Sequence, residues 1–339
     1  MTPPLLDSRL PIVAAPMAGG PSTVALAHAV ASAGAFGFLA GGYKSPEALA
    51  AEIDQLRPLG AGFGVNLFVP ADDPVDEAAF ATYADELGAE AEAYGLELDP
   101  TPFADDDRWG EKLALLLAEP VPVVSLTFGL PDPADIAALQ RVGTRVLASV
   151  TTPGEARLAR DAGVDGLVVQ GPAAGGHCAT FDPTRVPPPQ PTAALVTQVL
   201  AHGDLPVVAA GGVDGPDAVR ALLDAGAEAV AVGTLLLRTD EAGTSATHKR
   251  ALGDPAFTET VLTRAFTGRP ARALRNGFTD RHPEGPGGYP AVHHLTRALR
   301  RAAADAGDAD RLHLWAGTGW RNAPTGPAAD VIRHLSGGV

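Results

Sequence analysis

The chain has 339 residues, of which 46% are hydrophobic and 19% charged, with a formal net charge of −15. This length allows two domains, or one (β/α)8 barrel of about 250 residues with additions. The acidic balance argues against a nucleic-acid partner. The single cysteine, Cys178, favours a reducing, cytoplasmic compartment, and the absence of a long apolar run argues against a membrane span or a secretory leader.

Short apolar runs alternate with helical patterns along most of the chain. The runs expected to form strands cover 11–17, 35–42, 63–69, 121–128, 145–150, 166–171, 206–212 and 229–234. Helix-capping residues such as Thr23 and Ser45 follow the first two runs. Because the runs are almost continuously apolar, we expect a parallel sheet covered on both faces. Eight such units predict an α/β fold, a (β/α)8 TIM barrel, with a doubly wound open sheet as the alternative.

The distribution of charge divides the chain further. Residues 71–119 carry fifteen acidic side chains against Arg108 and Lys112, whereas residues 246–339 carry thirteen Lys or Arg against eight acids. These opposite charges lead us to expect that the two segments pack near each other. We therefore predict a barrel from 1–70 plus 120–245. A smaller, mostly helical lid or second domain would come from 71–119, an insertion after the third strand, plus 246–339.

A glycine loop with one histidine follows the sixth apolar run. Gly175 and Gly176 allow a close approach between the backbone and a flat or phosphorylated ligand. The adjacent His177 is a candidate general base, because the imidazole pKa lies near working pH. The competing interpretation is an ordinary loop with a solvated or capping histidine.

The ends of the seventh and eighth runs suggest a phosphate site. Gly211-Gly212 and Gly233-Thr234 would expose backbone N–H groups where such barrels usually bind phosphate. Asn66 and Gln170 are polar amides at the ends of apolar strands, and with Met17 they would form a wall suited to a heteroaromatic ring.

These stretches resemble the nitronate monooxygenases, which are FMN-dependent (β/α)8 barrels. The motifs that carry the resemblance are 15–23, 64–70, 170–181 and 209–212 with 233–234, and the tail is similar at 265–272 and 314–317. The resemblance implies an FMN cofactor and His177 as the catalytic residue. It implies FMN contacts at Pro16, Met17, Asn66, Gln170, Gly175, Gly211, Gly212, Ala231, Val232, Gly233 and Thr234.

The activity implied by this resemblance is a flavin-dependent oxidation. Alkyl nitronates, and nitroalkanes after loss of a proton, would react with O2 to give a carbonyl compound and nitrite. An NAD(P)H-dependent enoyl reductase-like enzyme, an FMN barrel acting on a specialised biosynthetic intermediate, and a flavin-binding module without turnover are the alternatives. The expected partners are a small-molecule substrate and O2, with a homodimer left open.

The chain departs from the family pattern at two places. Residues 177–181 read His-Cys-Ala-Thr-Phe where the family commonly has His-Arg-Gly-Thr-Phe, and Thr127 stands where many members have a histidine. Thr127 and Tyr289 are candidates for the substrate pocket. Cys178 lacks a second histidine that could activate it as a nucleophile. No metal site is expected, since there is no paired-cysteine motif and the only histidine pair, at 293–294, is adjacent in sequence.

Overall fold

A computed structural model of the chain describes residues 5–60, 62–70 and 74–337. Eight parallel strands form one sheet within these residues: β1 (Ile12–Ala14), β2 (Gly37–Ala40), β3 (Phe63–Phe68), β4 (Val123–Thr127), β5 (Arg145–Val150), β6 (Gly166–Gln170), β8 (Val207–Ala210) and β9 (Ala229–Val232). Their order is β1-β9-β8-β6-β5-β4-β3-β2. The edges β1 and β2 meet where the Ala14 N–H donates to the Phe36 carbonyl at 2.8 Å. The predicted TIM barrel is therefore confirmed, and the open sheet is excluded.

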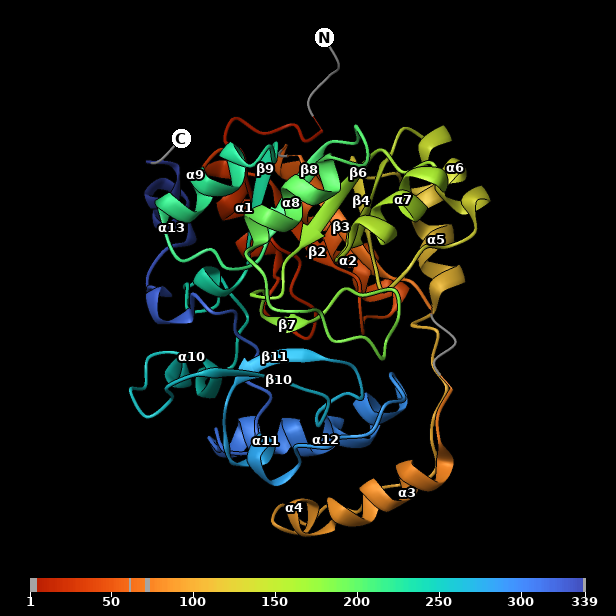
Figure 1. Cartoon of the computed structure of the whole chain (residues 1–339), viewed down its shortest axis with the longest axis vertical. Coiled ribbons are helices and arrows are strands. Elements are labelled where there is room, and N and C mark those ends of the chain that lie inside the picture. Colours follow the sequence, from red (N-terminus) through yellow and green to blue (C-terminus); the bar gives the residue numbers. More distant parts are fainter. Residues whose placement is uncertain (1–4, 61, 71–73, 338–339) are drawn as a thin grey trace.

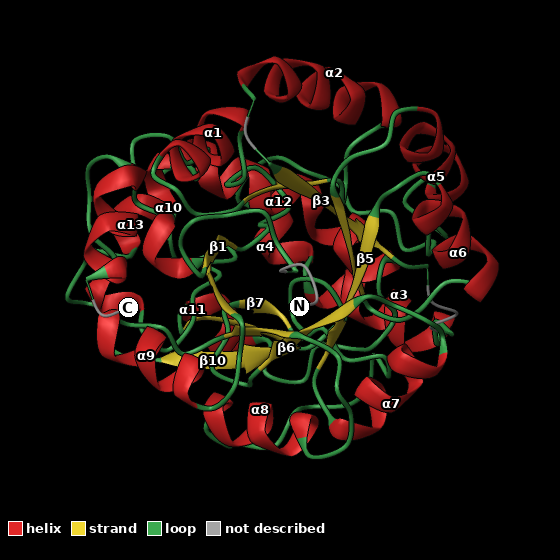
Figure 2. Cartoon of the chain, turned by 90° about the horizontal axis from the view of Figure 1, so that it is seen from above, coloured by secondary structure: helices red, strands yellow, loops and turns green. Residues whose placement is uncertain are grey.

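Helices surround this barrel, as Figure 2 shows. They are α1 (Val24–Ser32), α2 (Pro46–Leu56), α5 (Trp109–Ala118), α6 (Pro133–Arg141), α7 (Pro153–Asp161), α8 (Thr192–Leu200), α9 (Pro216–Asp224) and α13 (Ala328–Ser336). The side chains of Thr23 and Ser45 accept backbone N–H bonds at the starts of α1 and α2, as their N-cap positions predict. The last helix, α13, returns from the end of the chain to pack between α1 and α9.

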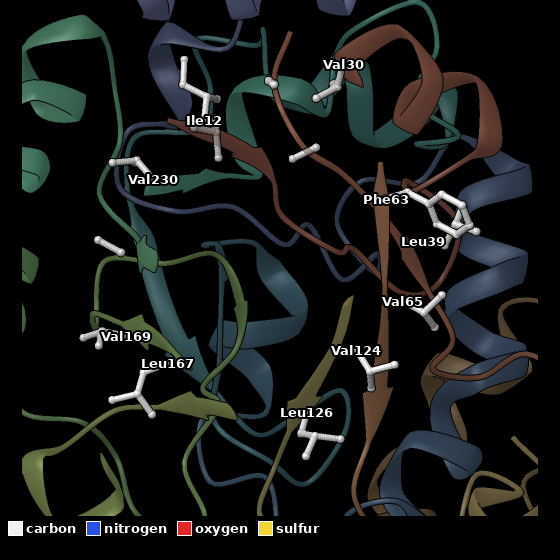
Figure 3. Packing of buried hydrophobic residues seen from close by; sticks show 14 of the residues in the cluster. Ile12, Val30, Leu39, Phe63, Val65, Val124, Leu126, Leu167, Val169 and Val230 are labelled. Atoms are coloured by element: carbon white, nitrogen blue, oxygen red, sulfur yellow. The ribbon is translucent and has the colours of Figure 1, made fainter. Parts of the chain in front are cut away.

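The strands bury apolar side chains on both faces. Val65, Val124 and Val169 belong to the core between strands and helices, which Figure 3 shows in part. Alternate positions, such as Phe38 and Val208, fill the interior of the barrel. This double burial explains why the strands appear as continuous apolar runs in the sequence.

A second group of elements covers the carboxyl ends of the strands, seen below the barrel in Figure 1. Within the described residues it contains a three-stranded sheet of β7 (Gly176–His177), β10 (Thr260–Thr263) and β11 (Ala271–Leu274). The sequence patterns did not predict this sheet. The associated helices are α3 (Glu77–Glu86), α4 (Gly88–Glu92), α10 (Ala246–Ala251), α11 (Gly277–Arg281) and α12 (Ala291–Ala306). Short 3-10 turns lie at η1 (Arg57–Leu59), η2 (Thr234–Leu236) and η3 (Trp320–Asn322).

The acidic segment contacts the basic tail, as its charge predicts. Glu90 is buried and accepts bonds from Arg281 at 2.6 Å and from Arg311 at 2.5 Å. Tyr83 donates to the Ala265 carbonyl at 2.7 Å. The helices α5 and α13, however, lie in the ring around the barrel. The division into two domains stays a prediction.

Nowhere in the described part of the chain is there a helix with the length and apolar character needed to cross a membrane.

Candidate active site

A cavity of about 640 Å³ lies over the carboxyl ends of the barrel strands. It is lined by the strand ends and by the segment around Trp315. The structure brings most of the predicted site residues together there: Pro16, Met17, Asn66, Thr127, Gln170, Gly175, His177, Gly211, Gly212, Ala231, Gly233 and Thr234. Residues almost 220 positions apart in the sequence thus border one space, because all parallel strands end at the same face.

Two predicted residues lie elsewhere. The Val232 side chain is 1% exposed and belongs to the core between strands and helices, since side chains alternate along β9 and Ala231 faces the cavity. Tyr289 lines an adjoining space of about 30 Å³. Its ring centroid is 5.6 Å from that of His177, and its hydroxyl donates to the Tyr43 hydroxyl at 3.1 Å. Tyr289 is therefore a neighbour of the catalytic candidate and lies behind the cavity wall.

Free backbone donors lie at the ends of β8 and β9. The N–H groups of Gly212, Gly233 and Thr234 donate to no other described residue. Gly212 has a φ of +84°, a conformation that favours glycine. The turn between Gly233 and η2 presents its N–H groups as the start of a helical turn does. Clustered N–H groups of this kind form an anion site.

The two amides fix the walls of the cavity. Asn66 Nδ2 donates to Ser125 Oγ and to Thr127 Oγ1, both at 2.9 Å, which joins the ends of β3 and β4. Gln170 Nε2 donates to the His177 carbonyl at 3.1 Å, and Gln170 Oε1 accepts from the Ala179 N–H at 2.8 Å. Both polar atoms of Gln170 thus hold the loop on either side of residue 178, a role that its position in the sequence does not predict.

His177 borders the cavity with a neutral imidazole ring. Removal from water, with help from the positive charges of Arg269 and Arg300, lowers the pKa of His177 to about 3. Its Nε2 lies 2.9 Å from Thr267 Oγ1, and Nδ1 makes no hydrogen bond to a described residue. The neighbouring thiol differs, because burial raises the pKa of Cys178 to about 11. Cys178 is therefore not a thiolate nucleophile at neutral pH.

Several cavity residues come from the tail and were missed by the sequence patterns. Arg300, on α12, is buried and donates to the His293 carbonyl at 2.9 Å and to Thr296 Oγ1 at 3.0 Å. Burial lowers the pKa of Arg300 to about 10. His293 and Arg300 are seven positions apart, so they share one face of α12. That spacing, in the most basic part of the chain, is the signal that could have identified them.

No group of three or more His, Cys, Asp or Glu side chains within the described ranges is arranged to hold a metal ion.

The position of this cavity is the one that enzymes use in (β/α)8 barrels. Its free N–H groups are suited to a phosphate-bearing cofactor, which defines the class as a cofactor-dependent barrel enzyme. A family model described as nitronate monooxygenase matches residues 4–338. The chain belongs to the nitronate monooxygenase family, and it is a flavin-dependent oxidoreductase. The family and enzyme class expected from the sequence motifs are confirmed.

Named relatives agree with this assignment. A nitronate monooxygenase of Pseudomonas aeruginosa is 40% identical, over 98% of this chain and 96% of its own length. A probable nitronate monooxygenase of Staphylococcus aureus is 32% identical, over 98% of this chain and 94% of its own length. Among solved structures, a nitroalkane oxidase from Streptomyces ansochromogenes has a TM-score of 0.92 at 48% identity, covering 97% of this chain and 95% of that one.

More distant structures share the architecture. FabK from Thermotoga maritima has a TM-score of 0.74 at 26% identity, covering 98% of this chain and 93% of that one. The enoyl reductase domain of a Bacillus amyloliquefaciens macrolactin protein has a TM-score of 0.63 at 12% identity, which shows the fold alone.

Proposed function

We propose that the chain uses FMN to oxidise alkyl nitronates with O2, which yields a carbonyl compound and nitrite. Neutral nitroalkanes would enter the same reaction after loss of the proton next to the nitro group. The observation that carries this proposal is that His177 lines the same cavity as the free backbone N–H groups of Gly212, Gly233 and Thr234. The names of the similar proteins from Pseudomonas and Streptomyces point to the same substrates.

The cavity residues fit FMN. The cavity volume of about 640 Å³ lies within the range of about 300–1,000 Å³ that is typical of ligand sites. The free N–H groups of Gly212, Gly233 and Thr234 would bind the phosphate, whereas Met17 and Ala231 would border the ring. Bound FMN would supply the electron transfer that side chains cannot perform.

The chain itself supplies proton transfer and exclusion of water. We assign His177 the removal of the proton from a neutral nitroalkane, because its ring borders the cavity and its Nδ1 makes no hydrogen bond to a described residue. Phe128 and Trp315 pack against its ring at centroid distances of 5.6 and 5.5 Å. These aromatic walls keep water from the ring and restrict its position.

The variant His177→Gln should affect neutral nitroalkanes and preformed nitronates differently. The kcat/KM for neutral nitroethane should fall by about 10²- to 10⁴-fold, the usual contribution of a general base. The kcat/KM for preformed ethylnitronate should change little, since that substrate has already lost its proton. Nitrite release and oxygen uptake measure both values, and flavin absorbance checks that the cofactor is retained.

Equal losses on the two substrates would refute the role of His177 as base. Wild-type protein that consumes NADH and releases no nitrite would refute the proposed reaction and favour the reductase alternative.

A cytoplasmic location and a homodimer are also part of the proposal. The single cysteine supports the first, and gel filtration of the purified chain would test the second.

A further inference from the structure

A buried hydroxyl is the only side-chain hydrogen-bonding partner of the His177 ring among the described residues. Thr267 Oγ1 lies 2.9 Å from Nε2 of His177 and 3.3 Å from the carbonyl oxygen of Arg269. Thr267 is 1% exposed, so water does not compete for its hydroxyl. No carboxylate of the described residues is within hydrogen-bond distance of this ring.

The three groups have one arrangement in which each polar atom is satisfied. A carbonyl oxygen can only accept, and a threonine hydroxyl has a single proton to donate. If that proton goes to the Arg269 carbonyl, then Nε2 must carry a proton and donate it to Oγ1. In the reverse arrangement the hydroxyl would donate to Nε2 instead, and the carbonyl oxygen of the buried Arg269 would lose its bond from Thr267, which is costly.

We infer that Thr267 is a positioning residue that holds His177 in the Nε2-protonated tautomer, with Nδ1 directed to the substrate as the proton acceptor. This inference rests on the proposed function, because it assigns a tautomer to the base named there. Thr267 itself does not line the cavity.

The surrounding backbone keeps the hydroxyl in register with the ring. Ala271 pairs directly with His177 across β11 and β7, whose adjacent placement is visible in Figure 1. The Cys178 N–H donates to the Pro270 carbonyl at 2.8 Å. The Arg269 guanidinium donates to the carbonyls of Cys178 and Thr180. The turn that carries Thr267 is thus fixed to the His177 loop on both sides.

A hydroxyl also suits the charge of the site. A carboxylate partner would stabilise the imidazolium ion and raise the pKa of the ring. Thr267 orients the ring without adding negative charge, while Arg269 and Arg300 oppose protonation. The resting ring is therefore neutral and has a defined tautomer until it accepts the substrate proton.

The test compares Thr267→Val, which keeps the shape and removes the hydroxyl, with Thr267→Ser, which keeps the hydroxyl. Two-bond proton–nitrogen correlation spectra of the flavin-loaded protein with isotope-labelled histidine report the tautomer. The signals of His177 are identified among the nine histidines by their loss in His177→Gln. We expect a protonated Nε2 in the wild type and in Thr267→Ser, and a mixture of tautomers in Thr267→Val.

Kinetics provide the second measurement. Thr267→Val should lower kcat/KM for neutral nitroethane by about 10-fold, the effect of one neutral hydrogen bond on the tautomer population. Activity on preformed ethylnitronate should change little, and Thr267→Ser should restore the wild-type ratio of the two activities.

A wild-type His177 protonated at Nδ1 would overturn the inference, as would an unchanged tautomer in Thr267→Val. A wild type that releases no nitrite from either substrate would refute the proposed function instead, while the spectra would still decide the role of Thr267.

Discussion

Replacing Gly175 with alanine should displace the loop that carries His177. A Cβ at this position would lie 2.4 Å from the backbone nitrogen of Gly317 and 2.6 Å from the carbonyl carbon of Ala316. Atoms of these types rest at about 3.5 Å, so one of the two backbone segments must move by about 1 Å. Such overpacking costs about 1–3 kcal/mol of folding free energy. A displacement of about 1 Å at a reacting group costs about 100-fold in rate.

Gly176→Ala is the matched control, because the adjacent glycine has the opposite properties. Its φ is +74°, but an added Cβ would meet nothing within 4 Å. The strain of that conformation costs about 1–2 kcal/mol, without a clash against Gly317. We expect lower stability in both variants, and a loss of about 100-fold in kcat/KM for neutral nitroethane in Gly175→Ala alone.

Three measurements separate the effects: the free energy of unfolding in urea, the dissociation constant of FMN from fluorescence titration, and nitrite release. A Gly175→Ala variant with wild-type kcat/KM and FMN affinity would refute the predicted displacement of the His177 loop, as would a Gly176→Ala variant that loses more of either.

Two buried titratable residues, Glu90 and His248, should make the free energy of unfolding depend on pH. Burial raises the pKa of Glu90, but hydrogen bonds from Arg281 and Arg311 lower it below its ordinary value. Glu90→Gln should therefore cost about 1–2 kcal/mol of unfolding free energy at pH 7. This cost should shrink as the pH falls below about 4.3, the ordinary pKa of a glutamate, and disappear below the lowered pKa of the folded state. A difference that persists at lower pH would contradict the ion-pair account. Burial lowers the pKa of His248 to about 4. Its unfolded form binds a proton below about pH 6.5, so stability is full above that pH and falls toward pH 4. His248→Gln should reduce the loss of stability between pH 7 and 5.5 by about 1 kcal/mol, measured by urea unfolding; an unchanged loss would exclude His248 as a source.

Local sequence patterns were sufficient to predict the barrel. Each apolar run is buried on both faces, so hydrophobicity alone marks its position in the chain. Capping residues such as Thr23 and Ser45 act within three residues of their own helix, and the sequence displays them directly. Gly212 and Gly233 could be placed at the proposed phosphate site because parallel strands must all end at one face.

The features that the sequence did not predict depend on contacts between segments far apart in the chain. The pairing of His177 with Ala271, the return of α13 to the ring and the burial of Arg300 in the cavity each join segments far apart in the chain. A strand as short as β7 has no periodicity that could reveal its partner. The sequence of this protein therefore determines which residue types stand at the strand ends, since burial and capping are local properties. The protonation state and partner of His177 were decided only by the folded chain, because they depend on which distant groups exclude water from the ring.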